Sequence, residues 1–317
     1  MARVRGSNPM KVIIIRYAEL GLKSERVRSR FLNRLLEDIG SRLADDRIEH
    51  ILRSERGRIF LETDEIDRAV EILRKIPGIY SISVAQEAPS DIEGLMEALS
   101  GYSRKRLKEG MTFGIKVKKS VEMELSSRDI AIMGGSAACS HLDEESVTVD
   151  LKDPDIWFEI EIRREHAYLF TERIKGMGGM PSSTQGKVLL FLPERKTLSG
   201  TKTESGRRAL LSKKMMIRRG CRVIPALFEK DMAGWDDILG ELREEEKDPF
   251  LLSRKDLAEA IKEALEKTGS IGLVHPGTLE DLINNEDLSE NSLQTPIFQP
   301  TIALENSEIK EWLSNHL

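Results

Sequence analysis

The stretch from Phe170 to Leu192, FTERIKGMGGMPSSTQGKVLLFL, decides the fold of this 317-residue chain. Its middle, residues 176–186, holds four glycines and one proline, too many breakers for the interior of a helix or strand. We therefore expect a linker there. The apolar run Lys187–Leu192 that follows is typical of a strand inside a parallel sheet. The stretch thus predicts a boundary between two kinds of domain.

Downstream of the linker, strands and helices alternate along the sequence. Such alternation predicts a Rossmann-like α/β domain over residues 187–317. After the first strand we expect a helix around Ala209–Arg218, a strand at Arg222–Phe228, helices at Trp235–Arg243 and Arg254–Lys267, and a strand at Ser270–His275.

Upstream of the linker, the order of elements is different. The β-branched strand Lys11–Tyr17 is followed by a helix with apolar residues at helical spacing. The full order of strand, helix, two strands, helix, strand is the split β-α-β pattern of ferredoxin-like domains. After the first strand we expect a helix at residues 24–43, strands at 48–54 and 58–62, a helix at 66–75 and a strand at 79–86. A second α+β region follows, with helices at 91–108 and 126–138, strands at 112–118 and 146–151, and a hairpin of 157–163 with 167–173.

Charge is distributed unevenly along the chain. The net charge is −5, yet residues 1–60 carry +6 and residues 172–220 carry +9, whereas residues 61–171 carry −8 and residues 221–317 carry −12. Basic segments attract the phosphate backbone of nucleic acids, and acidic segments repel it. A nucleic acid is therefore expected on the two basic segments, with ordinary solvated surface charge as the alternative explanation.

Composition excludes several classes of protein. Apolar residues make up 39% of the chain but form no run long enough to span a bilayer, so we expect no membrane association. Residues 1–9 lack the apolar stretch of a secretory signal, which predicts a cytoplasmic protein, and Met10 is an alternative start. Cys139 and Cys221 stand far apart and outside any CxxC pattern, so we expect neither a disulfide nor a metal site.

Four blocks of sequence resemble the tRNA 4-thiouridine synthetase family, a group of tRNA sulfurtransferases linked to thiamine biosynthesis. The resemblance is strong over residues 11–192 and thin beyond them. It implies a ferredoxin-like domain at residues 10–75, a THUMP domain at 76–175, the linker at 176–186 and a PP-loop-type α/β domain at 187–317. The four blocks are Arg16–Phe31, Ile76–Glu87, Val149–Asp155 and Phe170–Leu192.

The same resemblance, together with the basic segments, predicts tRNA rather than DNA as the partner. Cations at three- and four-residue spacing share one face of the first helix, lysines follow a THUMP strand, and the bare amides of the glycine linker could approach a phosphate. Few aromatic residues lie among these cations, which favours recognition of a folded RNA through its backbone. The predicted RNA-binding residues are Lys23, Arg26, Arg30, Lys116, Lys118, Lys119, Arg163, Arg173, Lys175 and Lys187.

The ATP-binding half departs from the family at one loop. In the family, the strand matching Lys187–Leu192 leads into S-G-G-x-D-S, whose small residues let backbone amides reach phosphates. Here it runs into PERKTLSGTKTESG, Pro193–Gly206, without the second glycine and the aspartate. We expect a degenerate PP-loop, with ATP and Mg²⁺ as cofactors only if the altered loop still binds nucleotide. The weak nucleotide-binding candidates are Ser199, Gly200 and Lys202, whereas Cys221, Asp231 and His275 are interpreted as structural residues.

Three functions stay open at the level of sequence. The first is a tRNA-binding protein of tRNA thio-modification that lacks the standard ATP-activating loop and works with a separate sulfur donor or activating enzyme. The second is an active tRNA 4-thiouridine synthetase, which adenylates a uridine of tRNA through an unorthodox loop. The third is an interaction scaffold whose acidic C-terminal domain recruits a basic partner. No catalytic residue is assigned, and a homodimer is an expectation from the family alone.

Overall fold

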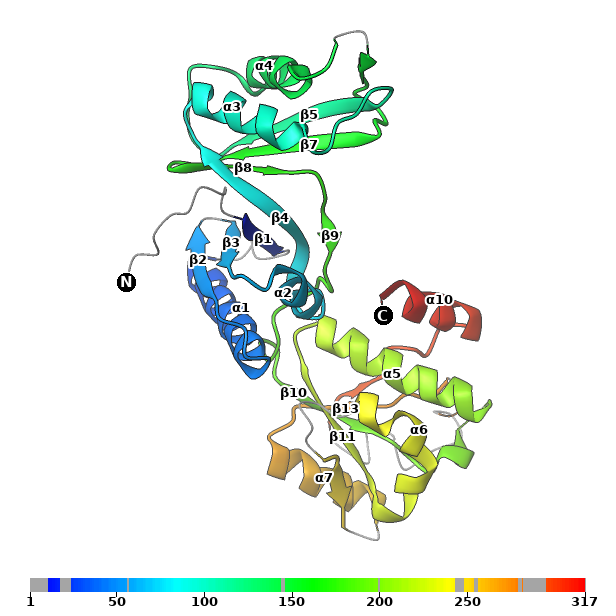
Figure 1. Cartoon of the computed structure of the whole chain (residues 1–317). Coiled ribbons are helices and arrows are strands. Elements are labelled where there is room, and N and C mark those ends of the chain that lie inside the picture. The colour runs from blue at the N-terminus through cyan, green and yellow to red at the C-terminus, as the bar shows by residue number, and fades with distance from the viewer. Residues whose placement is uncertain are drawn as a thin grey trace. The chain divides into compact units, whose positions relative to one another are not determined.

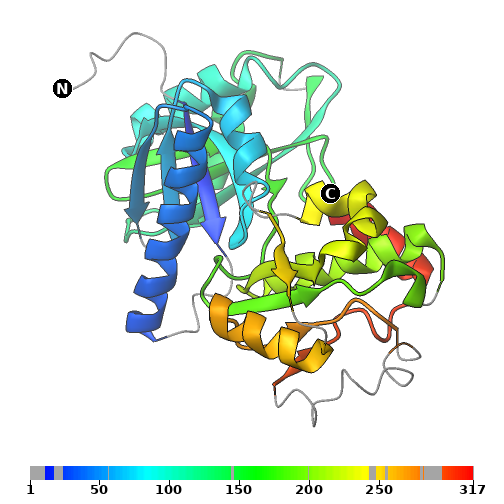
Figure 2. The same ribbon diagram turned by 90° about the horizontal axis from the view of Figure 1, so that it is seen from below.

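The computed structural model describes residues 11–17, 24–55, 57–143, 146–198, 200–242, 248–253, 256–278, 281 and 295–316. The chain divides into two compact units, which Figures 1 and 2 show from two directions. No helix within these described ranges is long and apolar enough to cross a membrane. Unit 1 comprises Met1–Tyr17, Gly40–Lys75 and Tyr80–Gly176, and unit 2 comprises Ala18–Ile39, Ile76–Ile79 and Met177–Leu317.

Unit 1 is built on a nine-stranded sheet in the order β2-β3-β1-β4-β8-β7-β5-β6, with β9 pairing to β4. The ferredoxin-like order of elements expected from the sequence is present in its first part. β1 (Lys11–Tyr17) is antiparallel to β3 (Arg58–Glu62), which is antiparallel to β2 (Ile51–Glu55). The other elements of the ferredoxin-like order are β4 (Ile79–Pro89), α2 (Ile66–Leu73) and α1 (Glu25–Asp45). Helix α1, which belongs to unit 2 as far as Ile39, buries Phe31, Leu35, Ile39 and Leu43 at four-residue spacing.

The second part of the same sheet packs against two helices. Phe113, Phe158 and Ile160 belong to one apolar core that also includes residues of α3 and α4, so both helices cover the same face (Figure 1). Alternate residues of the strands point to the opposite face, away from these helices. β5 (Thr112–Lys119) is parallel to β6 (Thr148–Val149) and β7 (Ile156–Ile162), and β8 (His166–Phe170), β9 (Ile174–Lys175), α3 (Ile92–Ser103) and α4 (Ser127–Cys139) complete the part.

Unit 2 centres on a five-stranded sheet in the order β12-β11-β10-β13-β14, in which all neighbours are parallel. Val188 and Leu190 of β10 pack with α5 and α6, whereas Leu189 and Phe191 pack with α7 on the other face, seen on the opposite side of the sheet in Figure 2. This is the layered α/β domain predicted from the sequence. Its elements are β10 (Lys187–Phe191), α5 (Lys202–Arg218), β11 (Arg222–Phe228), α6 (Met232–Leu242), β12 (Phe250–Leu252), α7 (Leu257–Thr268), β13 (Leu273–Val274) and β14 (Ile297–Phe298).

Helix α5 begins earlier than the sequence prediction, which places it around Ala209–Arg218. Thr201 and Glu204 form a capping box, so the helix starts at Lys202. The connection after β10 is correspondingly shorter than expected. A C-terminal helix, α10 (Asn306–His316), is absent from the sequence prediction, and its Ile309 and Leu313 are buried in a small cluster with Leu211 of α5.

Candidate nucleic-acid interface

One face of the sheet in unit 1 carries charged residues at alternate positions of β5 and β7. Neighbouring residues in register on adjacent strands point to the same side of a sheet, and successive residues along a strand alternate between sides. We call this side, which points away from α3 and α4, the charged face. Its register pairs are Gly114 with Trp157, Lys116 with Glu159 and Lys118 with Glu161, and Arg163 follows in the same alternation.

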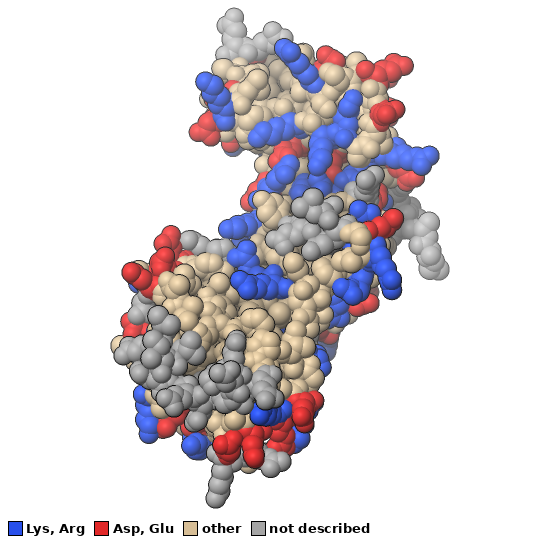
Figure 3. All heavy atoms as spheres, turned by 180° about the vertical axis from the view of Figure 1, so that it is seen from behind, with Lys and Arg blue, Asp and Glu red and all other residues tan. Residues whose placement is uncertain are grey.

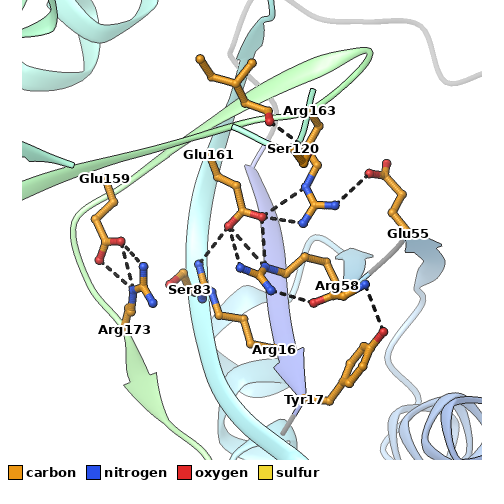
Figure 4. Close-up of polar contacts among 12 residues, drawn as sticks. Arg16, Tyr17, Glu55, Arg58, Ser83, Ser120, Glu159, Glu161, Arg163 and Arg173 are labelled. Atoms are coloured by element: carbon orange, nitrogen blue, oxygen red, sulfur yellow. Dashed lines mark hydrogen bonds and ion pairs between the residues drawn. The ribbon is translucent and has the colours of Figure 1, made fainter. Parts of the chain in front are cut away.

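Glu161 is the centre of a group of buried charges (Figure 4). The residue is 2% exposed, and its carboxylate accepts a hydrogen bond of 2.6 Å from Arg163 Nη2. Arg58 Nε lies 3.0 Å and Arg16 Nη2 lies 3.7 Å from its oxygens. Burial alone would raise the pKa of Glu161, but the hydrogen bond from Arg163 and the three positive charges outweigh it and lower the pKa. One carboxylate therefore orients guanidinium groups from β1, from β3 and from the residue after β7.

The positive charge around Glu161 exceeds the negative charge. Burial first, and then the charge of Arg173, lower the pKa of Arg16 to about 10. The pKa of Lys118 is also lowered, chiefly by Arg58 and then by burial. The neighbouring cations are thus the main cause for Lys118, whereas burial is the main cause for Arg16. Lys and Arg side chains are frequent on the surface of unit 1 in the view of Figure 3, and such a surplus attracts anions.

Two further contacts extend the charged face toward solvent. Arg173 holds Glu159 through a bidentate ion pair, with Nε 2.8 Å from Oε1. Lys116 Nζ lies 3.5 Å from the centroid of the Trp157 ring, a cation–π contact. The ring covers Gly114, where a Cβ atom would come within 2.4 Å of it. Trp157 is missing from the predicted RNA-binding residues, although the alternation WFEIEIR of residues 157–163 already indicates that it shares a face with the charges.

Three further predicted residues of unit 1 relate to this group in different ways. Lys119 falls on the side of the sheet opposite to Lys118, and its Nζ donates a hydrogen bond of 2.7 Å to the carbonyl of Leu125. Arg163 is only 6% exposed, so it is part of the buried group and not an exposed phosphate ligand by itself. Lys175 is exposed on β9. The structure thus brings Lys116, Lys118, Arg163 and Arg173 together and leaves Lys119 and Lys175 outside the group.

In unit 2, the cations predicted on the first helix are only partly available to a ligand. Arg26 and Arg30 are exposed on α1. Arg34, one turn further along, is engaged, because it pairs with Asp38 at 3.0 Å and donates to the carbonyl of Ser182. Lys23 lies outside the described residues. Lys187 is exposed at the start of β10, where its Nζ donates to the carbonyl of Thr268 at 3.0 Å.

The glycine linker uses several of its backbone amides within its own chain. Gly178 N donates to the carbonyl of Ile79 at 2.7 Å, and Met180 N donates to the carbonyl of Arg218 at 2.9 Å. Gly179 has a φ of +74°, and a Cβ atom there would lie 2.2 Å from the Arg218 carbonyl oxygen. The backbone amides of Gly178 and Met180 are therefore not available for the phosphate contacts suggested by the sequence.

A cavity of about 400 Å³ lies in unit 2 at the C-terminal ends of β10 and β11. Three lysines line it together with the carboxylate of Asp231, whose pKa is raised by burial. The sequence candidates Gly200 and Lys202 belong to this lining, whereas Ser199 lies outside the described residues. The cavity is lined by Glu194, Arg195, Lys196, Leu198, Gly200, Lys202, Lys230, Asp231 and Gly234.

Arg195 is fixed at this cavity by groups of its own chain. It is 8% exposed, forms an ion pair with Asp237, and lies with its Cζ 4.7 Å from the centroid of the Trp235 ring. Its Nε donates to Ser205 Oγ at 3.0 Å, and Nη1 donates to the carbonyl of Gly234 at 2.8 Å. The guanidinium therefore ties the connection after β10 to α5 and α6.

Cys221 has the character of a structural residue. It is 7% exposed, and burial raises the pKa of its thiol. A raised pKa keeps the thiol protonated at neutral pH, whereas a nucleophilic cysteine needs the thiolate.

Comparison with known domain families assigns two domains in the N-terminal half of the chain. Residues 12–83 match the model of the ThiI ferredoxin-like domain, and residues 89–172 match the model of the THUMP domain. Relatives named probable tRNA sulfurtransferase occur in several organisms. The one from Methanocaldococcus jannaschii is 29% identical, over 94% of this chain and 85% of the relative. The one from Methanothermobacter thermautotrophicus is 31% identical, over 67% of this chain and 51% of the relative.

Two solved structures are similar in fold to this chain over nearly its whole length. PH1313 from Pyrococcus horikoshii superposes with a TM-score of 0.74 at 26% identity and covers 96% of this chain and 99% of its own. A 4-thiouridine synthetase in complex with RNA and bound ATP superposes with a TM-score of 0.69 over 97% of this chain and 85% of its own. At 19% identity, that second likeness concerns the fold alone. The succession of ferredoxin-like, THUMP and parallel-sheet domains expected from the sequence is thereby confirmed.

Proposed function

We propose that this THUMP-domain protein, a relative of the tRNA sulfurtransferases, binds tRNA and that the charged face of its sheet contributes to the binding. The observation that carries the proposal is that the guanidinium groups of three arginines gather around the one carboxylate of Glu161. Phosphate contacts supply most of the affinity of proteins for nucleic acids. The RNA in the complex of the 4-thiouridine synthetase, whose fold is similar, supports the same partner.

The geometry of the charged face favours contacts to the sugar-phosphate backbone. Arg58 and Arg163 are held in place by Glu161 and Glu55, so their orientation is fixed before a ligand arrives. Preorganised cations lose less entropy on binding than mobile ones. Lys116 and Lys118 are exposed and add mobile charges beside them, and Trp157 adds one aromatic ring. This combination suits folded RNA, in which phosphates and an occasional accessible base lie side by side.

The same proposal includes a C-terminal domain that does not hold a triphosphate in the standard way. A nucleotide-binding loop presents the backbone amides of a helix N-terminus to phosphate. At the N-terminus of α5, the carboxylate of Glu204 already accepts from the backbone nitrogen of Thr201, and the side chain of Thr201 accepts from that of Glu204. The Arg195 guanidinium occupies the adjacent space, 2.5 Å from where a Cβ atom on Gly206 would lie. Both features support a protein that binds tRNA without activating ATP by itself.

A second candidate function is an active tRNA sulfurtransferase with an altered loop. The observation in its favour is the cavity at the ends of β10 and β11, where Lys196, Lys202 and Lys230 would attract a triphosphate. The ATP in the 4-thiouridine synthetase complex also supports it. In this case Mg²⁺ would accompany the nucleotide.

One pair of measurements separates the two candidates. The first is the affinity of the full chain for unmodified tRNA at several salt concentrations, where binding that weakens steeply with salt is expected. The second is equilibrium dialysis of ATP and Mg²⁺ against the protein, with and without tRNA. Salt-dependent tRNA binding without ATP retention supports the first candidate, and ATP retention with release of pyrophosphate supports the second. A protein that binds no tRNA even in dilute buffer contradicts both and leaves the scaffold function.

A further inference from the structure

An apolar groove runs between helix α4 and strand β6, at one edge of the nine-stranded sheet. It has a volume of about 560 Å³ and lies entirely within unit 1. Three of its aliphatic side chains, Ile132, Val149 and Leu151, are 62%, 58% and 71% exposed. Soluble proteins rarely expose several large apolar side chains next to one another, and such patches mark contact sites. The groove is therefore open to solvent and suited to an apolar partner.

The register of the sheet assigns the groove to the side that α3 and α4 cover. Phe113 belongs to the apolar core on that side and is in register with Val149, so both side chains point the same way. Val147 precedes Val149 by two residues and lines the same groove. The charged face lies on the opposite side of the sheet. An inference about the groove is therefore independent of the proposed tRNA binding.

Helix α4 has one stripe of residues in the core and a second stripe along the groove. The buried stripe is Ile130, Gly134 and Ala138, and the groove stripe is Arg128, Ile132, Gly135 and Cys139, at three- and four-residue spacing. A Cβ atom on Gly135 would meet no other atom within 4 Å, so the groove has free space beside the helix. Arg128 is the one charged residue among those that line the groove. The carboxylate of Asp129, next to it, is held by Ser126 in a capping box.

Strand β6 has one edge that is not paired with another strand of the described residues. It is the last strand in the order of the sheet and pairs with β5. Thr148 N donates to the carbonyl of Met111 at 3.3 Å, and Asp150 N donates to that of Phe113 at 2.9 Å. Backbone groups of successive strand residues point to opposite sides, so the N–H and C=O of Val149 point away from β5. An unpaired edge of this kind is a template for a further strand.

The two edges of the nine-stranded sheet differ in charge. At the other end of the sheet, β2 carries Arg53 and Glu55 among its five residues. Charged side chains on an edge strand oppose pairing with other chains. Strand β6 consists of Thr148 and Val149, and the carboxylate of Asp150 after it is turned to its own loop, where it accepts from Lys152 N at 2.7 Å. The edge of β6 is thus available to another main chain, with the groove beside it for alternate side chains.

We propose that β6 and the groove along α4 bind an extended peptide segment of a partner protein, which adds to the sheet as a further strand. The main chain of the segment pairs with the N–H and C=O of Val149, and aliphatic side chains at every second position enter the groove. A carboxylate of the segment meets Arg128. A small apolar molecule leaves the edge of β6 unpaired. A second copy of this chain is less suitable, because a two-fold axis at the groove places one concave surface against another.

A blocked seven-residue peptide, in which three isoleucines alternate with two threonines between terminal glutamates, is the probe. We expect saturable binding of the fluorescently labelled peptide to the full chain in anisotropy titrations. The same peptide methylated on all its amide nitrogens should not bind, since it has no donors for strand pairing. Replacement of both glutamates by lysines should weaken the binding, because lysine repels Arg128. Bound peptide should also slow the alkylation of Cys139 by N-ethylmaleimide and leave the buried Cys221 unaffected.

Two substitutions test the groove and the strand edge separately. Gly135→Leu fills the groove at a position where the new side chain has free space. Val149→Pro removes the N–H on the open edge and leaves the hydrogen bonds of Thr148 and Asp150 to β5 intact. We expect each to weaken the peptide about tenfold, since one loses apolar contacts and the other a hydrogen bond. Gly101→Leu, at a similarly free position of α3, and Val149→Thr, which keeps the N–H, are the matched controls and should bind as the wild type does.

The results that contradict the proposal are distinct. The absence of saturable binding, or equal binding of the methylated peptide, would overturn it. Binding that is lost in Gly135→Leu but unchanged in Val149→Pro would show an apolar pocket without strand pairing, which also overturns it. Analytical ultracentrifugation of the full chain covers the remaining occupant. A dimer that Gly135→Leu dissociates and Gly101→Leu does not would assign the groove to a second copy of this chain in place of a partner protein.

Discussion

The carboxylate of Glu204 accepts a hydrogen bond of 2.7 Å from the backbone nitrogen of Thr201, so the N-terminus of α5 is occupied by an anion of its own chain. This hydrogen bond is the main reason why the pKa of Glu204 is lowered, which keeps the carboxylate ionised. An ionised carboxylate also interacts favourably with the positive end of the helix dipole. The contact between Thr201 and Glu204 therefore stabilises the start of α5, and a substitution at the cap can measure its contribution to the free energy of unfolding.

Thr201→Ala removes one half of this capping box. We expect the free energy of unfolding to fall by about 1 kcal/mol, the usual cost of replacing a threonine cap by alanine. Urea unfolding followed by tryptophan fluorescence measures the change, since Trp235 is buried beside α5 in the core of unit 2. Thr203→Ala is the control, because that side chain is exposed within the first turn. An equal loss in both variants would contradict the capping role.

Glu161→Gln tests the centre of the buried charges. The substitution keeps the shape of the side chain but leaves Arg16, Arg58 and Arg163 without their shared carboxylate. Breaking a buried ion pair by removing one partner typically costs about 3–5 kcal/mol. We expect a loss of this order in the free energy of unfolding, measured by urea denaturation. Glu165→Gln, at an exposed position near the β7–β8 turn, should change the stability by much less.

The pH dependence of stability provides an independent test of Glu161. Its pKa in the folded protein lies below the ordinary value of 4.5, so its contribution to stability is fully present above that pH. The contribution is lost as the pH falls through the lower, folded-state pKa. The difference in unfolding free energy between the wild type and Glu161→Gln should therefore shrink as the pH falls below 4.5. A difference that stays constant into the acid range would show that Glu161 does not act through its charge.

The exposed lysines of the charged face test the proposed RNA contacts. Lys116→Glu and Lys118→Glu should each weaken the binding of tRNA. Each should also reduce the slope of log affinity against log salt by about one for every phosphate that the variant no longer neutralises. Filter binding or fluorescence anisotropy over a salt series measures both quantities. Lys262→Glu changes the charge equally at an exposed position of α7 and serves as the matched control. Equal effects at all three positions would indicate a response to net charge alone.

Much of the fold can be predicted because its elements have strong periodic patterns. The sequence predicts the strand Arg222–Phe228 with the bounds that the structure has, since its β-branched and apolar run is bounded by Gly220 and by charged residues. The predicted start of α5 is wrong, because residues 202–208 are rich in polar side chains and show no apolar periodicity. The capping pattern of Thr201 and Glu204 is nevertheless readable in the sequence. Local polar signals are therefore as informative as hydrophobic spacing at helix ends.

The candidate interface can be predicted only in part, because charge pairing joins residues far apart in the sequence. Arg58 and Glu161 are 103 residues apart and meet only because β4 pairs with β8 and so joins the two parts of one sheet. Alternation along β7 places Arg163 on the side of Glu161, but nothing local predicts that Arg163 is buried while Arg164 beside it is exposed. Alternation along β5 does separate Lys118 from Lys119, and this distinction is available from the sequence. The sequence therefore predicts in part which residues share the charged face, but it does not predict which of them form ion pairs.

Gly114→Ala tests whether the position of Trp157 matters for binding. A Cβ atom at residue 114 would come within 2.4 Å of the Trp157 ring, so the ring must move away and release its contact with Lys116. Overpacking of this kind typically costs about 1–3 kcal/mol of stability. Because an aromatic ring beside cations can stack on a base, we also expect weaker tRNA binding. Urea unfolding and anisotropy titrations measure the two effects.

Gly101→Ala separates the effect of the Trp157 contact from that of the glycine exchange itself. Gly101 lies inside α3, and a Cβ atom there would meet no other atom within 4 Å. Alanine is the better helix former by about 1 kcal/mol, so this variant should be as stable as the wild type or more stable, with unchanged tRNA affinity. Destabilised Gly114→Ala with full tRNA affinity would mean that Trp157 only packs against the strand. Loss of affinity in Gly114→Ala alone would assign the ring to the interface, because the two exchanges are chemically identical and differ only in what the new methyl group touches.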